Sequence, residues 1–567
     1  MIEGVKTTIR ELVGRASGED IQPDDIVESP VADYGCSIAF KLASKLKKNP
    51  ADIARELADK IRPSGAIKKV EADGGYINFH LDYALLAKEL LKTTLVEKMP
   101  PAGERIVLEH TSVNPSGPIH VGRLRNTIIG DSLKRILDFC GYDVETHYFV
   151  NDVGKQIAII ALGLEGKLEP DSQLVRKYEH YSRKEDFIVF FSYVTANKKF
   201  EEEVEFQKLV QEIIYQAENG DKNSLNKIKK AAQKCLNGQK ETFDRLNVKF
   251  DYFDFESDCL LDGSVRTILQ KLKKNRLWTS SEVGGGLDLS NYGLERKTGF
   301  TVLERADGTT VYLSRDLAYH LKKAELGAHL INVLGEDHKM QFQELKTILV
   351  RIFELQTRLD AVHYSFVSFE GSKLSTRRGQ IASVDELLDE AVEKAENEVK
   401  KRGIAGDDVA EMIGAGAVKF HIIKTSPNKP ITFIWKDALS FEGETGPYIQ
   451  YAHARSCRIL EKSGIKVEKI KPAAVSFELE NNEEKALVRT LSDFHGTVKK
   501  AASELRPDIL ASYMIKLTAD YGRFYIKCPV LDASEDVRAR RLLLVAKAKN
   551  TLGVGLGLLG ISAPERM

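Results

Sequence analysis

Long hydrophobic runs are missing from this chain of 567 residues. The most apolar stretch near its end, LGVGLGLLGI at 552–561, is ten residues long, whereas a helix needs about 20 to cross a bilayer. The first residues, MIEGVKTTIRELVGRA, are charged and lack the apolar core of a secretion signal. We therefore expect no membrane partner and a cytoplasmic location.

Cysteine is also scarce. No two cysteines form a Cys-x-x-Cys pair, and no cluster of histidines accompanies any of them. This scarcity argues against a structural zinc site and against a disulfide framework, and it fits a reducing compartment. We expect no metal site built from the protein's own side chains. The six cysteines are Cys36, Cys140, Cys235, Cys259, Cys457 and Cys528.

The chain has no excess of either charge, because 83 Lys and Arg residues balance 83 Asp and Glu residues. Zero net charge argues against a uniformly basic surface. It does not exclude a nucleic-acid partner, since local basic patches are enough to bind one. The length is too great for a single hydrophobic core, so several domains are expected.

The order of strand and helix patterns predicts a multidomain α/β protein. In the N-terminal part, Asn49 and Pro50 suit a helix start, and two short strand patterns flank Gly74-Gly75. The middle part alternates strands and helices, which favours a Rossmann-like parallel sheet, and a highly charged helical stretch interrupts it. The predicted domains are a small α+β domain at 1–95, the Rossmann-like domain at 96–435 with an insertion at about 165–250, and an all-α domain at 436–567.

The stretch NPSGPIHVGRLRN, residues 114–126, lies between a strand pattern at 105–112 and a helix pattern that ends near Gly141. A helix N-terminus attracts phosphate, because its backbone N–H groups are free and the helix dipole is positive there. His120 and Arg123 are three residues apart, so both can donate hydrogen bonds from the first turn. Taken alone, the stretch fits a phosphate site and a capped, solvated helix start about equally well.

A second polar stretch, GSKLSTRRG at 371–379, is flanked by glycines. Lys373, Arg377 and Arg378 could neutralise a leaving pyrophosphate if this loop closed over a triphosphate. An exposed basic turn is the alternative interpretation of the same residues.

Four blocks together resemble the arginyl-tRNA synthetase family of class I aminoacyl-tRNA synthetases. The resemblance covers nearly the whole chain in order, and the charged insertion is its least diagnostic part. Two positions depart from the family's motifs: Arg123 stands where a HIGH-type motif usually ends in His, and Thr376 stands where a KMSKS-type loop has its second Lys. The blocks are EHTSVNPSGPIHVGRLRNTIIGDSL, YFVNDVGKQI, GSKLSTRRG and LSFEGETGPYIQYAHAR.

The resemblance implies a two-step reaction that uses ATP and Mg²⁺. Arginine's carboxylate attacks the α-phosphate of ATP, and the terminal ribose of tRNA(Arg) then takes the arginyl group. The partners would be L-arginine and tRNA(Arg), and we expect a monomer. Catalysis would need no protein nucleophile, only positioning and charge stabilisation.

The resemblance also implies a role for individual residues. Asp316, four residues after Tyr312 on an expected helix, is the predicted partner of the arginine guanidinium. The predicted catalytic residues are His120, Arg123 and Lys373. The predicted ATP-binding residues are Gly117, Pro118, His120, Gly122, Arg123, Gly335, His338, Lys373, Ser375 and Arg377. The predicted arginine-binding residues are Glu109, Asn114, Tyr312, Asp316 and Gln341, and the predicted tRNA contacts are Asn78, Phe79, Arg523 and Tyr525.

Alternatives remain at this stage for the residues and for the function. Without the resemblance, Tyr312 and Asp316 would be read as a surface pair on a helix. Tyr525 fits a base-stacking platform, which suits single-stranded anticodon bases, and it also fits a core aromatic. The whole chain could instead be another class I nucleotidyltransferase or a non-catalytic tRNA-binding relative of the synthetases.

Overall fold

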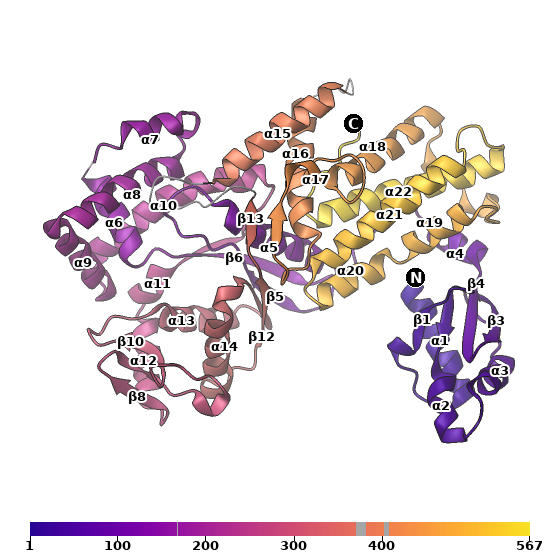
Figure 1. The fold of residues 1–567 in the computed structure, drawn as a ribbon, viewed down its shortest axis with the longest axis horizontal. Helices are drawn as coiled ribbons and strands as arrows, with labels where there is room; N and C mark the ends of the chain where they lie inside the picture. The colour runs from indigo at the N-terminus through magenta and orange to yellow at the C-terminus, as the bar shows by residue number, and fades with distance from the viewer. Residues whose placement is uncertain (167, 370–381, 402–406) are drawn as a thin grey trace.

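The chain forms an elongated molecule in which an α/β body lies between a helical insertion and a helical C-terminal part (Figure 1). The computed structural model describes residues 1–166, 168–369, 382–401 and 407–567. The N-terminal domain packs beside the C-terminal helices, since helix α4 (Tyr83–Leu90) contacts helix α19 (Asn482–Ser492) and Arg489 pairs with Glu28. The predicted multidomain α/β fold is confirmed.

The N-terminal domain is α+β, as expected. Its four strands form an antiparallel sheet in the order β1-β2-β4-β3, and Gly75 turns the β3–β4 hairpin at φ 92°. Asn49 caps α3 by accepting a hydrogen bond from the Ala51 N–H, and Pro50 is the first residue of that helix. The elements are α1 Ile2–Ser17, β1 Ile26–Glu28, β2 Tyr34–Cys36, α2 Ile38–Leu46, α3 Pro50–Lys60, β3 Ile67–Asp73, β4 Tyr76–Leu81 and α4 Tyr83–Leu90.

The central domain contains a five-stranded parallel sheet in the order β12-β11-β5-β6-β7. The chain order reverses at β5, so the carboxyl ends of β5, β6 and β11 border the crevice where such sheets bind ligands. The first strand ends at Glu109 rather than at the predicted residue 112, because Thr111 and Ser112 have φ angles of 73° and 43°, which a strand does not allow. The elements are β5 Arg105–Glu109, α5 Val121–Phe139, β6 Asp143–Val150, α6 Lys155–Glu165, β7 Tyr252–Phe255, α11 Glu256–Leu261, α12 Ser264–Lys273, α13 Tyr312–Ala324, β11 His329–Gly335, α14 Lys339–Thr347 and β12 Arg358–Tyr364.

Two additions interrupt this sheet. The charged stretch after α6 folds into helices that stand at one end of the molecule (Figure 1). A small antiparallel sheet, in the order β10-β9-β8, follows α12 and was not expected from the sequence. The elements are α7 Ser172–Lys177, α8 Glu185–Glu202, α9 Val204–Glu218, α10 Lys222–Arg245, β8 Trp278–Ser281, β9 Gly284–Leu287 and β10 Thr301–Arg305.

The C-terminal part is helical from α17 onward in the residues that the structure describes. Before it, two short strands, β13 and β14, pair in parallel, and α15 packs on α16. Among the helices of the described ranges, none has both the length and the hydrophobicity of a membrane span. The elements are β13 Val367–Phe369, α15 Val384–Lys401, α16 Asp407–Ile423, β14 Ile431–Phe433, α17 Trp435–Ala438, α18 Gly446–Ser463, α19 Asn482–Ser492, α20 Phe494–Ser503, α21 Pro507–Lys527 and α22 Glu535–Leu558.

Candidate active site

His120 is the N-cap of α5, at the carboxyl edge of the sheet. Its Nδ1 accepts a hydrogen bond of 2.9 Å from the Gly122 N–H, so the ring proton sits on Nε2 and can be donated outward. Burial, and then the charge of Arg123, lower the pKa of His120, which keeps the ring neutral near pH 7. A Cβ on Gly122 would lie 3.1 Å from Nδ1 and crowd this cap. The exposed Arg123 side chain adds a cation in the same helix turn.

The insertion shapes the loop that leads to His120. A Cβ on Gly117, whose φ is 153°, would lie 3.0 Å from the Cβ of Phe190 on α8, so only glycine fits against that helix. The carbonyl of Gly117 accepts from Gln239 Nε2 on α10 at 2.9 Å, and Pro118 is buried beside it. The loop is therefore fixed from the insertion side as well as by α5.

A small cavity opens beside this loop. Its volume is about 20 Å³, and it joins residues from three stretches, among them Asn114, Asn151 and Tyr312. Asn114 lies between two amides: its Nδ2 donates to Gln156 Oε1 at 3.2 Å, and its Oδ1 accepts from Asn151 Nδ2 at 3.1 Å. The structure thus brings the predicted Asn114 and Tyr312 to one cavity.

Helix α13 begins at Tyr312 and places Asp316 one turn further along, as the four-residue spacing predicted. The Asp316 carboxylate accepts from His320 Nδ1 at 2.9 Å, and its side chain is 26% exposed. Partial burial raises the pKa of Asp316, but the neighbouring His320, Lys323 and His338 outweigh burial and lower it overall. Asp316 is therefore an ionised carboxylate with some of its surface free.

Sequence analysis missed Glu256, a buried carboxylate at the end of β7. Its Oε1 accepts from Arg315 Nε at 2.5 Å, while Oε2 has no hydrogen-bond partner in the described part of the chain. Burial raises the pKa of Glu256 to about 7, although Arg315 opposes the shift. The Arg315 guanidinium that binds Glu256 lies 5.0 Å from the ring centroid of Tyr312, so Arg315 links the two side chains. The signal in the sequence was available: Glu256 follows a strand directly, at the ligand-binding edge.

Two contacts hold the carboxylates of this region in place. Asp152, from the Asn-Asp block, accepts from the N–H of Ser257 at 2.8 Å and from its hydroxyl at 2.6 Å, which fixes the start of α11 behind Glu256. On the other side, Glu218 at the end of α9 accepts from the Thr310 N–H at 2.7 Å, two residues before α13 begins. The insertion therefore also anchors the helix of Tyr312 and Asp316.

Glu109 was predicted to contact arginine, and the structure places it in a buried network. Its Oε2 accepts from Lys323 Nζ at 2.5 Å and from Asn332 Nδ2 at 2.8 Å, and its Oε1 lies 3.4 Å from the hydroxyl of Ser112. Both oxygens are therefore used within the protein. Because Lys323 belongs to α13, Glu109 ties that helix to the central strand.

The remaining predicted residues of this edge follow β11. Gly335 ends the strand, and a Cβ there would lie 2.3 Å from Asp337 Oδ1 in the next turn. His338 is partly exposed, and its Nδ1 lies 3.4 Å from Gln341 Oε1. Three other predicted residues, Lys373, Ser375 and Arg377, lie outside the described residues, as do Thr376 and Arg378.

The predicted tRNA contacts of the N-terminal domain require correction. Phe79 is fully buried in the core, and Asn78 is 2% exposed, with its Oδ1 accepting from the hydroxyl of Ser29. Neither side chain has a surface with which to contact a tRNA. The apolar alternation of Ile77, Phe79 and Leu81 along β4 explains the burial of Phe79, because alternate residues of a strand share one face, whereas Asn78 lies on the other face, covered by its contact with Ser29.

The C-terminal candidates are on the surface. Tyr525 is 41% exposed, and Phe524 fills the neighbouring core position, so the interpretation of Tyr525 as a core residue is wrong. The guanidinium of Arg455 lies 4.5 Å from the ring centroid of Tyr525 and 4.6 Å from that of Tyr451. Arg523, whose side chain is 62% exposed, pairs with Asp520.

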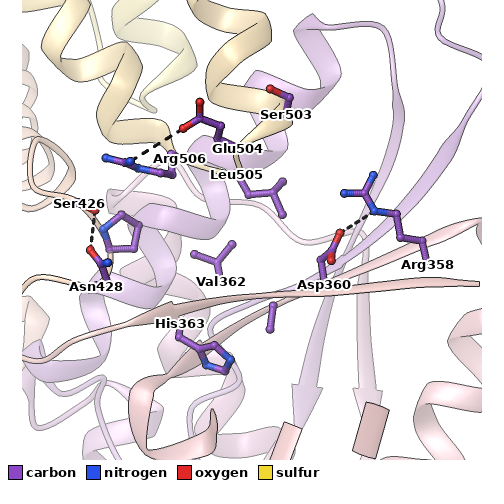
Figure 2. A pocket seen from close by; sticks show the side chains of 12 residues that line it. Arg358, Asp360, Val362, His363, Ser426, Asn428, Ser503, Glu504, Leu505 and Arg506 are labelled. Atoms are coloured by element: carbon purple, nitrogen blue, oxygen red, sulfur yellow. Dashed lines mark hydrogen bonds and ion pairs between the residues drawn. The ribbon is translucent and has the colours of Figure 1, made fainter. Parts of the chain in front are cut away.

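A larger cavity of about 380 Å³ lies elsewhere, between β12 and the joint of α20 and α21 (Figure 2). Its cations are already paired: Arg358 binds Asp360 at 2.8 Å, and Arg506 binds Asp508 at 2.6 Å. This cavity therefore lacks the free positive charge of a phosphate site. Its wall at Ser426, Pro427 and Asn428 belongs to a loop that also contacts α5.

Known protein families match the chain over nearly its whole length. Residues 84–435 match the catalytic domain of class I tRNA synthetases (R), residues 449–567 match the DALR anticodon binding domain, and residues 2–81 match the arginyl tRNA synthetase N-terminal domain. The three matches follow one another in the order of the three observed parts.

Individual relatives agree with these matches. The arginine--tRNA ligase of Methanocaldococcus jannaschii is 40% identical over 97% of this chain and 96% of its own, and that of Methanocella arvoryzae is 39% identical over 100% and 99%. Among solved structures, the arginyl-tRNA synthetase of Thermus thermophilus superposes with a TM-score of 0.82 at 29% identity, over 99% of this chain and 100% of its own.

Proposed function

The chain belongs to the arginyl-tRNA synthetase family, and we propose how its residues divide the work of ligating arginine to tRNA. The overall reaction is the ATP-dependent formation of an arginyl-adenylate, followed by transfer of the arginyl group to tRNA(Arg). The assignment of side chains to each step rests on the geometry of the carboxyl edge.

The N-terminus of α5 would bind the ATP phosphates. It offers the positive end of the helix dipole, the Nε2–H of His120 and the Arg123 guanidinium, all of which can stabilise charge that grows on phosphate oxygens. Lys373 would add a further cation against the leaving pyrophosphate. The nucleophile is the carboxylate of arginine itself, so positioning carries the catalysis.

Mg²⁺ would be bound mainly by the phosphates of ATP. Among the described residues, no group of three or more His, Cys, Asp and Glu side chains gathers as a metal site. Magnesium commonly keeps several waters and binds substrate phosphates, which fits such an arrangement. When bound, it would neutralise phosphate charge.

The guanidinium of arginine would bind between Asp316 and Glu256. The observation that carries this assignment is the buried Oε2 of Glu256, which has no partner among the described residues, while Oε1 binds the Arg315 that also contacts the ring of Tyr312. A buried carboxylate oxygen without a donor is destabilising, and a planar cation is well suited to supply the missing hydrogen bond. Asn114, at the mouth of the adjoining cavity, would contact the amino-acid end.

The tRNA would contact the C-terminal helices. Arg455 between Tyr451 and Tyr525 offers flat, partly exposed faces on which anticodon bases can stack. One chain carries the catalytic sheet and both flanking domains, so we propose a monomer. All six cysteines are free, which suits the reducing cytoplasm as the place of action.

Two assays of the purified protein test this function. ATP–pyrophosphate exchange should depend on arginine among the amino acids, and charging should occur with tRNA(Arg) alone among tRNAs. If ATP–pyrophosphate exchange depended on a different substrate and no tRNA were charged, the protein would be another nucleotidyltransferase. Binding of tRNA without exchange would favour a non-catalytic relative.

A further inference from the structure

A buried cation on α5 has no part in the reaction described so far. Arg125 lies five residues after His120, and with Arg540 it is one of the two largest side chains that are fully buried in the described chain. Its nearest partners are backbone carbonyls, and no ion pair with a carboxylate is found for it in the ranges that the structure describes. Keeping a guanidinium away from water without a carboxylate partner is expensive, so the position calls for an explanation.

The Arg125 guanidinium binds four carbonyl oxygens from two segments. Nη1 donates to Ser365 O at 2.7 Å and to Lys429 O at 2.6 Å. Nη2 donates to Ser426 O at 2.8 Å and to Thr425 O at 3.4 Å. These acceptors lie 240 to 304 residues further along the chain. One side chain of α5 therefore fastens two distant segments at a single point.

Both segments lead into the β13–β14 strand pair. Ser365 comes two residues before β13, and the loop 425–429 joins α16 to β14. Two backbone hydrogen bonds also join the segments to each other. The Ser365 N–H donates to Pro427 O at 2.9 Å, and the Ile431 N–H donates to Phe366 O at 3.2 Å. The cavity of Figure 2 is lined by Ser426 and Asn428 of this loop, and Arg125 is not among its lining residues.

Ser365, a partner of Arg125, is also hydrogen-bonded to the turn that carries predicted ATP-binding residues. The hydroxyl of Ser365 donates to Glu336 at 2.7 Å, in the turn that separates Gly335 from His338. On the other side of α5, the Val121 N–H donates to Ala382 O at 2.9 Å and His120 bridges to Ser383. Helix α5 is therefore bonded to the chain on both flanks of the stretch that contains Lys373.

We propose that Arg125 is a positioning residue for the ATP step. It fixes the β13–β14 pair and the Glu336 turn against the helix whose N-terminus presents His120. The arginine site proposed above lies at α11 and α13, and none of the four hydrogen bonds of Arg125 reaches those helices. The proposal rests on the ATP-dependent function described above.

Three variants of the full-length protein test the proposal: Arg125→Met, Arg125→Lys and the control Lys419→Met. Lys419 is the control, because it is 2% exposed and its Nζ also donates to backbone carbonyls, those of Leu246 and Gly560, which belong neither to β13 nor to β14; unlike Arg125, it also lies 3.9 Å from a carboxylate, that of Asp131. All assays contain tRNA(Arg). Wild-type exchange and charging, run in parallel, show separately whether the underlying function holds.

The expected result is a split between ATP and arginine. In Arg125→Met, kcat for ATP–pyrophosphate exchange should fall about 10- to 100-fold and the KM for ATP should rise, because a small misplacement of reacting groups has such an effect. The Kd of arginine, from equilibrium dialysis, should stay within about twofold. Amide hydrogen exchange should rise in 365–369 and 425–433 but not in β11. Lys419→Met should lower the Tm with normal kinetics per folded molecule.

Arg125→Lys keeps the charge but presents its donors from one nitrogen, so its exchange defect should be intermediate. If Arg125→Met does not fold, the kinetics of Arg125→Lys test the proposal instead. The proposal is overturned if folded Arg125 variants lose Tm as Lys419→Met does while kcat and the KM for ATP stay at the wild-type values. It is also overturned if ATP and arginine binding weaken in equal proportion.

Discussion

The two places where this protein would meet its substrates are built in opposite ways. At α11 and α13 the functional groups are carboxylates: Glu256 is buried and bound by Arg315, and Asp316 is three-quarters buried and bound by His320. At α18 and α21 they are the exposed ring of Tyr525 and the partly exposed ring of Tyr451, each with its centroid within 4.6 Å of the Arg455 guanidinium. The first region offers charge that is mostly shielded from water, and the second offers flat surface that is partly in water.

The difference follows from the size of the ligands. A single amino acid has few atoms, so each contact must be strong, and charge pairs gain strength when water is excluded. A tRNA covers a large surface, and stacking on exposed rings tolerates the movement of unpaired bases. Substitutions should therefore have larger effects at α11 and α13 than at α18 and α21.

The strongest test removes the guanidinium partner. Asp316→Ala should lower kcat/KM for arginine roughly 30-fold to several thousand-fold. This corresponds to a loss of about 2–5 kcal/mol of binding free energy, because one member of a desolvated charge pair is removed. The KM for ATP should change little. Lys322→Ala, on the same helix but in an exposed pair with Asp262, is the control and should act normally. Unchanged arginine kinetics in Asp316→Ala would remove this residue from the pocket.

The second test asks whether the two regions are independent. The cavity at Asn114 and Tyr312 has a volume of about 20 Å³, close to the space of one water molecule, so it must widen to admit arginine. If tRNA binding drives that widening, exchange with arginine should be weak without tRNA(Arg) and rise up to about 100-fold when it is added. Robust exchange without tRNA would show that the pocket is already formed.

The third test concerns the carboxylate that the structure added to the site. Glu256 must be ionised to bind a guanidinium, and burial raises its pKa to about 7 in the free protein. Arginine affinity should therefore fall as the pH drops below 7, by up to about tenfold per pH unit. Glu256→Gln should weaken binding at pH 8 by about 1.5–3 kcal/mol and flatten the pH profile. A pH profile identical to that of the wild type would assign the titration to another group.

The same raised pKa has a predictable effect on stability. Between the ordinary pKa of a glutamate and about 7, the folded protein binds the Glu256 proton and the unfolded chain does not. The contribution of Glu256 to the free energy of unfolding is therefore most favourable at acid pH and is lost as the pH rises through 7. Saturating arginine should reduce this loss, which differential scanning at several pH values would detect.

The smallest effect is expected at the exposed rings. Tyr525→Ala should raise the KM for tRNA by the equivalent of about 1–3 kcal/mol and leave arginine and ATP kinetics unchanged, because one stacking face is lost. Ile526→Ala, at a neighbouring side chain that is 73% exposed, serves as the control. An effect on arginine affinity as large as that of Asp316→Ala would erase the contrast between the two regions.

Local patterns in the sequence predicted the parts of the site that depend on neighbours in the chain. The spacing of Tyr312 and Asp316 put both on one helix, and the helix start at His120 has the expected position. The alternation around Phe79 also contained enough information to exclude that residue from the surface.

Long-range partners could not be predicted in this way. Nothing near Glu109 indicates that Lys323, 214 residues away, occupies its carboxylate, and nothing near Arg125 indicates its carbonyl partners. The choice between Phe524 and Tyr525 for the core depends on how α21 is rotated against its neighbours. Tertiary packing decides these points, and a sequence window does not contain it.

The bond from Glu218 to Thr310 limits how freely parts of this protein could be exchanged. Glu218 ends a helix of the insertion, and its side chain, 7% exposed, also lies 3.9 Å from Arg315, which in turn holds Glu256. A chimera that carried the insertion of a distant relative would therefore inherit a new support for α13. The arginine affinity of such a chimera should depend more on which residue stands at position 218 than on the rest of the inserted segment. The insertion and the pocket are therefore expected to evolve together.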